Sequence, residues 1–513
     1  MKIVTAHEMR RIDELAQTQY ALDGFDLMQH AARAIFDHAE ATYRPDRVCV
    51  LCGKGNNAGD GLLVAREFYT LGRTVTLVCV EGTDGFSGAA ASAWQAVHNL
   101  RIAVRPPEEL AAVLPQCDLV IDALLGTGID GAPREHYARA IELVNASGKP
   151  VVAADVPSGL RRVPPGERPS DIIKAALTVT IGLPKDIMLG WQARPWVGRL
   201  EVAPINFPPE LLTDDRWQLN WTPAGAVGEW LPRRAPDSHK GTWGHVGIVG
   251  ACVDFAGASV LAARAALRAG CGLATIYAPE ATAPVYQAAL PEAITRRLAS
   301  QDDAALDESS AEAFAALGAR HSIMVVGPGM GTSGASRGFL ERFLQDWTGP
   351  LLLDADALNL LAAHGILERI EGRVDCLLTP HPAEMARLAG CTVDVVQADR
   401  LTTARTAAQR HRVHVLLKGA DTLVACPSGQ VWLVPGGQPA LAKGGSGDVL
   451  SGVIASLYAQ GMGLAQAAVA GVTLQLCAAD HASRVHGSRG VLARDVADAI
   501  PLAADRVALL AKP

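Results

Sequence analysis

The feature that most limits how this chain can fold is a recurrence of short apolar segments separated by helical patterns. In the first part of the chain these segments are RVCVLC, TVTLVCV, DLVIDA, VVAAD and LTVTIG, at residues 47–52, 74–80, 118–123, 151–155 and 177–182. Their apolar residues do not alternate with polar ones, which is typical of strands buried on both faces of a sheet. A second series runs from residue 245 to 418. The sequence therefore predicts α/β structure with parallel sheets covered by helices.

A change of sequence character between residues 207 and 236 divides the two series. This stretch includes FPPELLTDD and LPRRAP and has no clear helical or strand period, as is common at domain junctions. With 513 residues, the chain is also too long for one ordinary core. We therefore expect two domains, at residues 1–215 and 225–513.

The segment ahead of the first strand, residues 5–43, is expected to be helical. Thr5 is a suitable N-cap, and Glu8 three residues later has the spacing of a capping box. Charged residues recur every few positions here, where a signal peptide would need an uninterrupted apolar stretch. The sequence therefore favours a cytoplasmic location.

Charge and hydropathy argue against nucleic-acid and membrane partners. The net charge is -7, and no run of basic residues is longer than a short pair, so the chain offers no strongly positive surface for a nucleic acid. Residues 449–479 lack charge and are long enough to span a bilayer. Ser and Gln side chains interrupt this stretch, and Gly461-Met462-Gly463 should divide it into two buried helices. We expect no membrane span.

A glycine-rich segment, GKGNNAGDG at residues 53–61, directly follows the first strand and precedes a helical pattern. Such a turn exposes backbone N–H groups at a helix N-terminus, where phosphate oxygens are favoured. The spacing matches neither the dinucleotide fingerprint nor the Walker loop. By itself the motif is equally compatible with a simple turn.

Polar residues also follow other strands of the first half. Asp122 ends one strand, and Asp155 and Ser158 follow another. Because ligands bind beyond the carboxyl ends of parallel strands, these residues and the glycine-rich segment should share one site. Asn57, Asp122 and Ser158 offer oxygen ligands for a cation. Asp155 is the candidate general base.

In the second half, the strongest signal is GGSGD at residues 444–448, followed by a helical pattern. Glycines before a helix form an anion hole, and Asp448 on the first turn can reach a hydroxyl that attacks the phosphate. An acid that only stabilises the helix N-terminus would not require the preceding glycines. His381, between two prolines at a strand exit, is expected to face a cleft rather than the core.

The motifs of the first half resemble the NAD(P)H-hydrate epimerases, with GKGNNAGDG, DALLGTG, DVPSG and GLPK over about residues 1–210. The resemblance implies a Rossmann-like three-layer sandwich, a potassium ion held by Asn57, Asp122 and Ser158, and Asp155 as the catalytic residue. The family usually has glycine at the position of Ala58, where a Cβ would be strained at positive φ. The implied substrate-binding residues are Asn56, Asn57, Ala58, Gly59, Asp60, Gly126, Thr127, Gly128, Ile129, Asp130, Gly131, Ala132 and Asp155.

The second half resembles the ADP-dependent NAD(P)H-hydrate dehydratases of the ribokinase-like superfamily. The motifs HKG, GPGMG, DADALN, TPHPAEM, LKG and GGSGDVLSG occur in that order over about residues 235–500. The resemblance implies a ribokinase-like α/β domain that uses ADP with magnesium, and Asp448 as the catalytic residue. The implied hydrate-binding residues are Ala258, Gly329, His381 and Asp448, and the implied nucleotide-binding residues are Lys418, Gly419, Ala420, Asp421, Thr422 and Gly447.

Together these resemblances imply a bifunctional repair enzyme, an isomerase and a lyase, acting on hydrated NADH and NADPH (NADHX and NADPHX). The first domain would interconvert the R and S hydrates, and the second would dehydrate the S form, converting ADP to AMP and phosphate. A homo-oligomer is expected. The alternatives are a ribokinase-like small-molecule kinase in the second half, and a nucleotide-binding regulatory module in the first.

Overall fold

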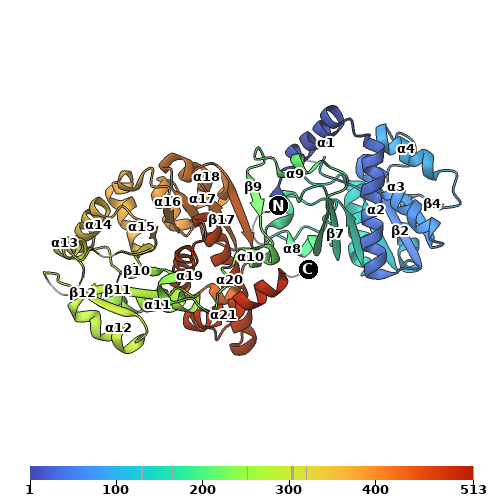
Figure 1. Cartoon of the computed structure of the whole chain (residues 1–513). Coiled ribbons are helices and arrows are strands. Elements are labelled where there is room, and N and C mark those ends of the chain that lie inside the picture. The colour runs from blue at the N-terminus through green and yellow to red at the C-terminus, as the bar shows by residue number, and fades with distance from the viewer. Residues whose placement is uncertain (129–130, 164–166, 251, 302–304, 319, 512–513) are drawn as a thin grey trace. The chain divides into compact units, whose positions relative to one another are not determined.

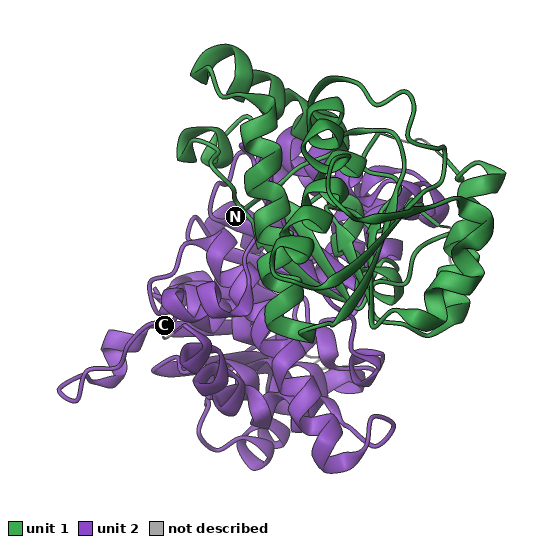
Figure 2. Cartoon of the chain, turned by 90° about the vertical axis from the view of Figure 1, so that its right-hand side faces the viewer, with its two compact units in different colours: residues 1–218 green, residues 219–513 purple. Residues whose placement is uncertain are grey.

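The structure is a computed structural model of the chain. It describes all residues except 129–130, 164–166, 251, 302–304, 319 and 512–513. Two compact units, residues 1–218 and 219–513, divide the chain within the proline-rich stretch (Figures 1 and 2). Each unit is an α/β fold, which confirms the predicted fold class.

The first unit is built on a parallel sheet with the strand order β4-β3-β2-β5-β6-β7-β8. The strands of this sheet are β2 (Arg47–Cys52), β3 (Thr74–Cys79), β4 (Ala103–Arg105), β5 (Leu119–Ala123), β6 (Val151–Ala154), β7 (Leu177–Ile181) and β8 (Arg199–Ala203), and the short strand β1 (Lys2–Ile3) lies outside it. The chain leaves β2 in one direction to β3 and β4, and returns on the other side to β5. This reversal at β2 and β5 is where doubly wound sheets bind ligands.

Helices cover both faces of this sheet, giving three layers. They are α1 (Ala6–Tyr20), α2 (Gly24–Tyr43), α3 (Asn56–Thr70), α4 (Gly88–Val97), α5 (Leu110–Val113), α6 (Glu135–Ser147), α7 (Asp186–Leu189), α8 (Arg194–Val197) and α9 (Pro209–Thr213). In β2, Val48 and Val50 pack toward α2, α3 and α4, whereas Cys49 and Leu51 pack toward α5 and α6. Burial on both faces explains why this strand shows no polar alternation.

The second unit has a larger sheet in which its strands follow the order β9-β18-β17-β16-β15-β14-β13-β10-β11-β12. These strands are β9 (Leu219–Trp221), β10 (His245–Val249), β11 (Leu273–Pro279), β12 (Ile294–Leu298), β13 (Ile323–Val326), β14 (Leu351–Leu353), β15 (Cys376–Leu378), β16 (His414–Leu417), β17 (Asp421–Ala425) and β18 (Val431–Pro435). Strands from β12 to β16 are parallel, and β16, β17 and β18 pair antiparallel. The order reverses between β10 and β13.

The helices of the second unit again lie on both faces of its sheet (Figure 1). They are α10 (Ala224–Trp230), α11 (Ala256–Arg268), α12 (Ala283–Ala289), α13 (Glu308–Ala316), α14 (Gly334–Asp346), α15 (Asp356–His364), α16 (Pro382–Ala389), α17 (Val393–Ala398), α18 (Arg400–His411), α19 (Ser446–Ala459), α20 (Leu464–His486) and α21 (Ala493–Leu510). Residues of α11, α19, α20 and α21 form one core with the strands.

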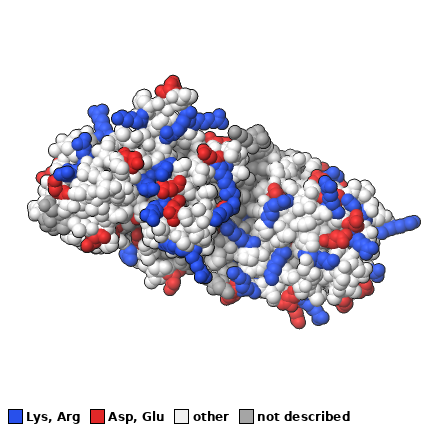
Figure 3. All heavy atoms as spheres, turned by 90° about the horizontal axis from the view of Figure 1, so that it is seen from below, with Lys and Arg blue, Asp and Glu red and all other residues white. Residues whose placement is uncertain are grey.

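The uncharged stretch at residues 449–479 lies within α19 and α20, which are separated at residues 460–463. Most of its side chains are buried in the core of the second unit, so the predicted division into two buried helices is confirmed. Among the described residues, no helix combines the length and apolar character needed to cross a membrane. On the face shown in Figure 3, acidic and basic side chains are intermixed.

Candidate functional sites

The first unit contains a cavity of about 990 Å³ at the carboxyl edge of its sheet. The residues that line it after the strands come from the segments following β2, β5, β6 and β7, so the predicted convergence of these segments is observed. Helices α1 and α2 supply further walls. The residues that line the cavity include Asp13, Lys54, Asn56, Asn57, Asp60, Gly126, Thr127, Gly128, Asp155 and Lys185.

Most of the glycine-rich segment at residues 53–61 is helical and does not form a long phosphate-binding loop, because α3 begins at Asn56. The N–H groups of Ala58 and Gly59 already donate to the carbonyl of Gly55, at 3.0 and 3.4 Å. Ala58 is buried in the core, and a Cβ at Gly59 would lie 2.5 Å from Sδ of Met28. Of the five residues 56–60, Asn56, Asn57 and Asp60 line the cavity, whereas Ala58 and Gly59 face the protein interior.

Ala58 itself is not strained. It is helical and does not have a positive φ. The Ala58 methyl group would strain this segment only at a positive φ, and Ala58 does not have one. The departure from the family's usual glycine gives no structural reason for weaker activity.

The predicted substrate loop at residues 126–132 reaches the cavity with only part of its length. Gly126, Thr127 and Gly128 line the cavity. Gly131 and Ala132 are exposed and do not belong to its lining. Ile129 and Asp130 lie outside the described residues.

The three residues predicted to bind potassium are brought together around the backbone of Leu125. The fully buried Asp122 carboxylate accepts hydrogen bonds from the Ser158 hydroxyl at 2.6 Å and the Ser158 N–H at 2.8 Å. The Asn57 amide donates to the carbonyl of Leu125 at 3.1 Å, and its Oδ1 atom is buried without a hydrogen-bond partner. Burial raises the pKa of Asp122 to about 6 despite these hydrogen bonds. An orphaned oxygen beside a buried carboxylate fits a bound cation.

Asp155 is held in a constrained position at the end of β6. It has a φ of 63°, which is unusual for a residue with a Cβ and is often found at functional sites. Its carboxylate accepts hydrogen bonds from Nζ of Lys185, from the Thr180 hydroxyl at 3.1 Å and from the N–H of Ile181 at 3.0 Å. Lys185 is only 1% exposed. These donors fix the carboxylate that faces the cavity.

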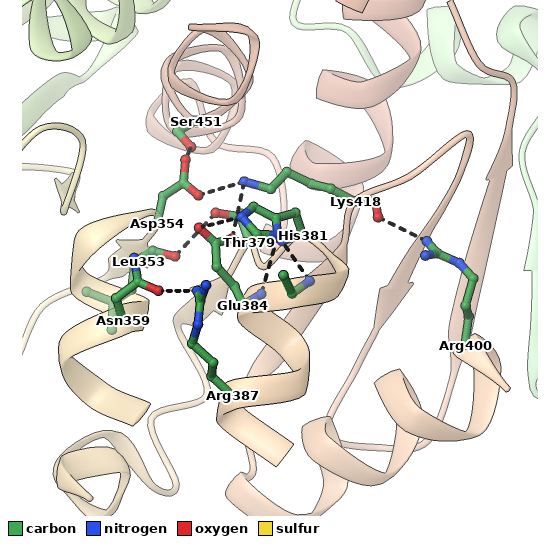
Figure 4. Close-up of polar contacts among 11 residues, drawn as sticks. Leu353, Asp354, Asn359, Thr379, His381, Glu384, Arg387, Arg400, Lys418 and Ser451 are labelled. Carbon is green, nitrogen blue, oxygen red and sulfur yellow. Dashed lines mark hydrogen bonds and ion pairs between the residues drawn. The ribbon is translucent and has the colours of Figure 1, made fainter. Parts of the chain in front are cut away.

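The second unit has its own charged network at the carboxyl ends of β14, β15 and β16 (Figure 4). Lys418 forms an ion pair with the buried Asp354 at 2.9 Å, and Glu384 lies 3.9 Å from the same ammonium group. Ser451 donates to the other oxygen of Asp354 at 2.8 Å. Burial alone would raise the pKa of Asp354, but Lys418 and these hydrogen bonds hold it below its usual value. Asp354 is thus a fixed anion that positions Lys418.

Asp448 lies on the first turn of α19, as predicted, next to this network. A Cβ at Gly447 would lie 3.4 Å from Nζ of Lys418 and 3.7 Å from a carboxylate oxygen of Asp354. Burial, followed by the negative charge of Asp354, raises the pKa of Asp448 to about 7, although Lys418 opposes this shift. A carboxyl that titrates near neutral pH is suited to general acid–base catalysis.

The predicted hydrate-binding residues border the same edge of the sheet. A Cβ at Gly329, whose φ is 68°, would lie 3.1 Å from Cβ of Ala258, so these two residues adjoin. His381 is half-exposed and is the N-cap of α16, where Nδ1 accepts from the N–H groups of Ala383 and Glu384. Its Nε2 atom lies 3.3 Å from Glu384. Since Nδ1 is occupied by the helix, only Nε2 can serve a ligand.

The predicted nucleotide segment, residues 418–422, forms the turn between β16 and β17. Arg400, a residue that the sequence did not single out, donates to the carbonyls of Leu417, Lys418 and Asp421 at 3.0–3.2 Å. The Thr422 hydroxyl closes the turn by donating to the carbonyl of Gly419 at 3.2 Å. The arginine shapes the segment without itself being part of it.

In the first unit, Lys185 was not identified as a functional residue from the sequence and was named only within the GLPK motif. Its position just after a predicted strand is the signal that could have identified it.

Comparisons with known proteins extend over both units. The family described as "NAD(P)H-hydrate dehydratase" matches residues 246–502, and the family described as "YjeF-related protein N-terminus" matches residues 24–187. A bifunctional NAD(P)H-hydrate repair enzyme from Moorella thermoacetica is 35% identical, with 98% of this chain and 96% of that protein covered.

Two solved structures resemble the second half of the chain. A ribokinase-like superfamily protein from Enterococcus faecalis has a TM-score of 0.50 at 21% identity, covering 57% of this chain and 97% of its own, and shows the ribokinase-like fold. An ADP/ATP-dependent NAD(P)H-hydrate dehydratase from Bacillus subtilis, crystallised with ATP and Mg²⁺, is 29% identical over 56% of this chain and 97% of its own, with a TM-score of 0.48. The full-length similarity and both family matches establish that this chain belongs to the bifunctional NAD(P)H-hydrate repair enzymes.

Proposed function

We propose that the first unit epimerises the R and S hydrates of NADH and NADPH, and that the second unit dehydrates the S form with ADP as the phosphate donor. The observation that carries this proposal is that in each unit a carboxyl group, Asp155 or Asp448, lies among polar side chains at the carboxyl edge of the sheet. Both activities in one chain would return all hydrated cofactor to NADH or NADPH.

In the first unit, we assign Asp155 the role of general base. Lys185, Thr180 and the N–H of Ile181 keep its carboxylate oriented toward the cavity. The first two N–H groups of α3 belong to Asn56 and Asn57. Gly126, Thr127 and Gly128 form another part of the cavity wall. These backbone groups are suited to the substrate's phosphates. Asn57, Asp122 and Ser158 would hold a potassium ion, which would neutralise the buried carboxylate and stabilise the adjoining segments.

In the second unit, Asp448 would take the proton of the ring hydroxyl, whose oxygen then attacks the terminal phosphorus of ADP and displaces AMP. The resulting phosphate ester loses phosphate from the ring carbon and a proton from the neighbouring carbon, which restores the ring double bond. Lys418, with a pKa raised by Asp354 and Glu384 against the effect of burial, remains a cation beside the phosphates.

Magnesium in the second unit would be held mainly by the nucleotide phosphates, as is common for this ion. Asp356 is the protein carboxylate best suited to assist, because it interacts electrostatically with Asp448 and, as far as the described residues show, its side chain accepts a single hydrogen bond, from the N–H of Gly331 at 3.0 Å. Among the described residues there is no cluster of three or more His, Cys, Asp or Glu side chains that would bind a metal without such phosphates. The expected homo-oligomeric state and cytoplasmic location stay predictions.

The experiment is to incubate the purified chain with an equal mixture of the R and S hydrates of NADH, together with ADP, magnesium and potassium, while following the near-ultraviolet absorbance of NADH. We expect complete recovery, because epimerisation would feed the R hydrate into the dehydratase. If NADH recovery stops near half, only the dehydratase is active and the epimerase is not. No recovery, with a stable phosphate ester as the product instead of free phosphate, would favour the alternative small-molecule kinase.

A further inference from the structure

Two carboxyl groups in the cavity of the first unit, those of Asp13 and Asp60, have no catalytic role in the assignments above. Asp13 and Asp60 both line the cavity together with Asp155 and Lys185. Asp60 is 7% exposed, and in the described part of the chain its carboxyl group has no hydrogen-bond partner. An unpartnered buried carboxyl group facing a cavity points to a ligand or a catalytic use.

Asp13 belongs to α1, which precedes the part of the chain matched by the family of the first unit. The capping box formed by Thr5 and Glu8 fixes the start of this helix. Met9, Asp13 and Gln17, spaced by four residues, all line the cavity, because this spacing places side chains on one helix face. The described residues offer no hydrogen-bond partner to the Asp13 carboxyl group.

The three carboxyl groups share one buried ammonium group. Lys185 contacts Asp155 directly, whereas Asp13 and Asp60 experience it only electrostatically. Burial raises the pKa of Asp13 to about 6; Lys185 opposes this shift, and the negative charge of Asp155 makes a smaller contribution that raises it. Burial, Asp155 and Asp13 raise the pKa of Asp60 well above its usual value. Burial and the neighbouring negative charges therefore favour the protonated forms of Asp13 and Asp60.

Epimerisation needs a proton donor as well as a base. Water adds to the enamine double bond of a dihydropyridine at the carbon next to the ring nitrogen, so the hydroxyl group is on a carbon that nitrogen can assist. A direct route that inverts this carbon has the hydroxyl group leave and water return on the opposite face. The first event consumes a proton and the second releases one.

We propose that Asp13 is the catalytic proton donor that acts with Asp155 in the cavity of the first unit, an inference that rests on the proposed epimerase function. The ring nitrogen's lone pair forms a C=N bond while the C–O bond breaks, and the leaving hydroxyl group takes the Asp13 proton to become water. Water then adds to the opposite face, the C=N electron pair returns to nitrogen, and Asp155 takes the released proton. Exchange with solvent restores both carboxyl groups.

Asp13 fits this role better than Asp60 because a catalyst must release and regain its proton in each cycle. The pKa of about 6 places Asp13 close to neutral pH, where both steps are favourable. Asp60 is more deeply buried than Asp13, and burial raises its pKa well above the usual value, so it is less suited to release a proton in every cycle.

The test compares Asp13→Asn with Glu14→Gln, a matched control on the adjacent, exposed position of α1. Conversion of purified R hydrate to S hydrate is followed by chromatography without ADP. We expect Asp13→Asn to lower kcat by about 10²- to 10⁴-fold with KM changed little, and the control to match the wild type. In the wild type, kcat should fall as the pH rises and the donor loses its proton. This alkaline decline should be absent from the residual activity of Asp13→Asn and present again in Asp13→Glu.

An Asp13→Asn enzyme with wild-type kcat, or one that keeps the alkaline decline, would overturn the role of Asp13. Dehydration of the S hydrate with ADP, measured in the same preparations, reports that the second unit is intact, and the thermal unfolding of the first unit reports whether that unit is folded. If the wild-type chain itself does not interconvert the hydrates, the epimerase function fails rather than this inference. If Asp13→Asn loses the fold of the first unit, the pH profile of Asp13→Glu still decides the question, since a retained acid must retain the alkaline decline.

Discussion

Replacing Asp448 by asparagine should inactivate the dehydratase and at the same time stabilise the second unit. Asn has the same shape as a protonated Asp but cannot take a proton from the ring hydroxyl, so we expect kcat to fall by about 10²- to 10⁴-fold with nucleotide binding retained. In the wild type, a pKa of about 7 means that the ionised fraction of Asp448 rises about tenfold between pH 6 and pH 8. The wild-type dehydration rate should rise by a similar factor.

The effect on stability follows from the same pKa. The Asp448 carboxyl group ionises near 3.8 in the unfolded chain but only near 7 in the folded one. Between these values the folded state binds more protons, so the free energy of unfolding falls as the pH rises. A difference of about three pKa units corresponds to at most about 4 kcal/mol. Because the site is partly exposed, we expect a gain of about 1–2 kcal/mol above pH 7, the range of single stabilising substitutions.

Thermal unfolding of the nucleotide-free enzymes at about pH 4.5 and pH 8 measures this gain. Each kcal/mol should raise the midpoint of the second unit's transition by about 2–4 °C. Asp505→Asn, at an exposed position on α21, is the matched control and should leave the midpoint unchanged. A variant at Asp448 that is less stable than the wild type at pH 8, or whose gain is the same at both pH values, would refute the electrostatic reasoning.

Three further substitutions test the first unit and its cavity. Asp155→Asn should lower the epimerisation rate about 10²- to 10⁴-fold while calorimetry still detects hydrate binding; an unchanged rate contradicts its role as the base. Lys185→Met removes the buried ammonium group that pairs with the partly buried Asp155 carboxylate, and chemical unfolding should show a loss of about 3–5 kcal/mol; an unchanged free energy of unfolding would contradict a structural role for this pair. Ala58→Gly should cost about 1 kcal/mol, because Ala58 is inside a helix, and a faster epimerisation would show that the methyl group hinders the site.

Features that depend on neighbouring residues were predictable from the sequence. The capping box of Thr5 and Glu8 was confirmed, because it involves residues three positions apart. The convergence of the segments after β2, β5 and β6 was also predictable, since parallel strands end at one edge of the sheet. The position of Asp448 on the first turn of α19 followed from the glycines that precede it.

Some details of the same segments depended on exact backbone geometry. Whether Ala58 would be strained could not be decided from its identity, because strain depends on φ. The start of α3 at Asn56 turned Ala58 and Gly59 toward the core, although both were expected to bind substrate. A shift of helix start by a few residues changes which side chains face a site, and sequence patterns locate helix ends only approximately.

The sequence alone determined the α/β fold class, the two series of strands and the polar groups at the strand ends, because strand burial and helix starts are local properties of the chain. Only the tertiary structure placed Asp13 of α1 in the same cavity as Asp155, and only it joined Arg400 to the turn after β16. These contacts link residues that are far apart in the chain, so they depend on how helices pack on the sheet. The raised pKa values of Asp13 and Asp448 have the same origin, because burial and neighbouring charges exist only in the folded protein.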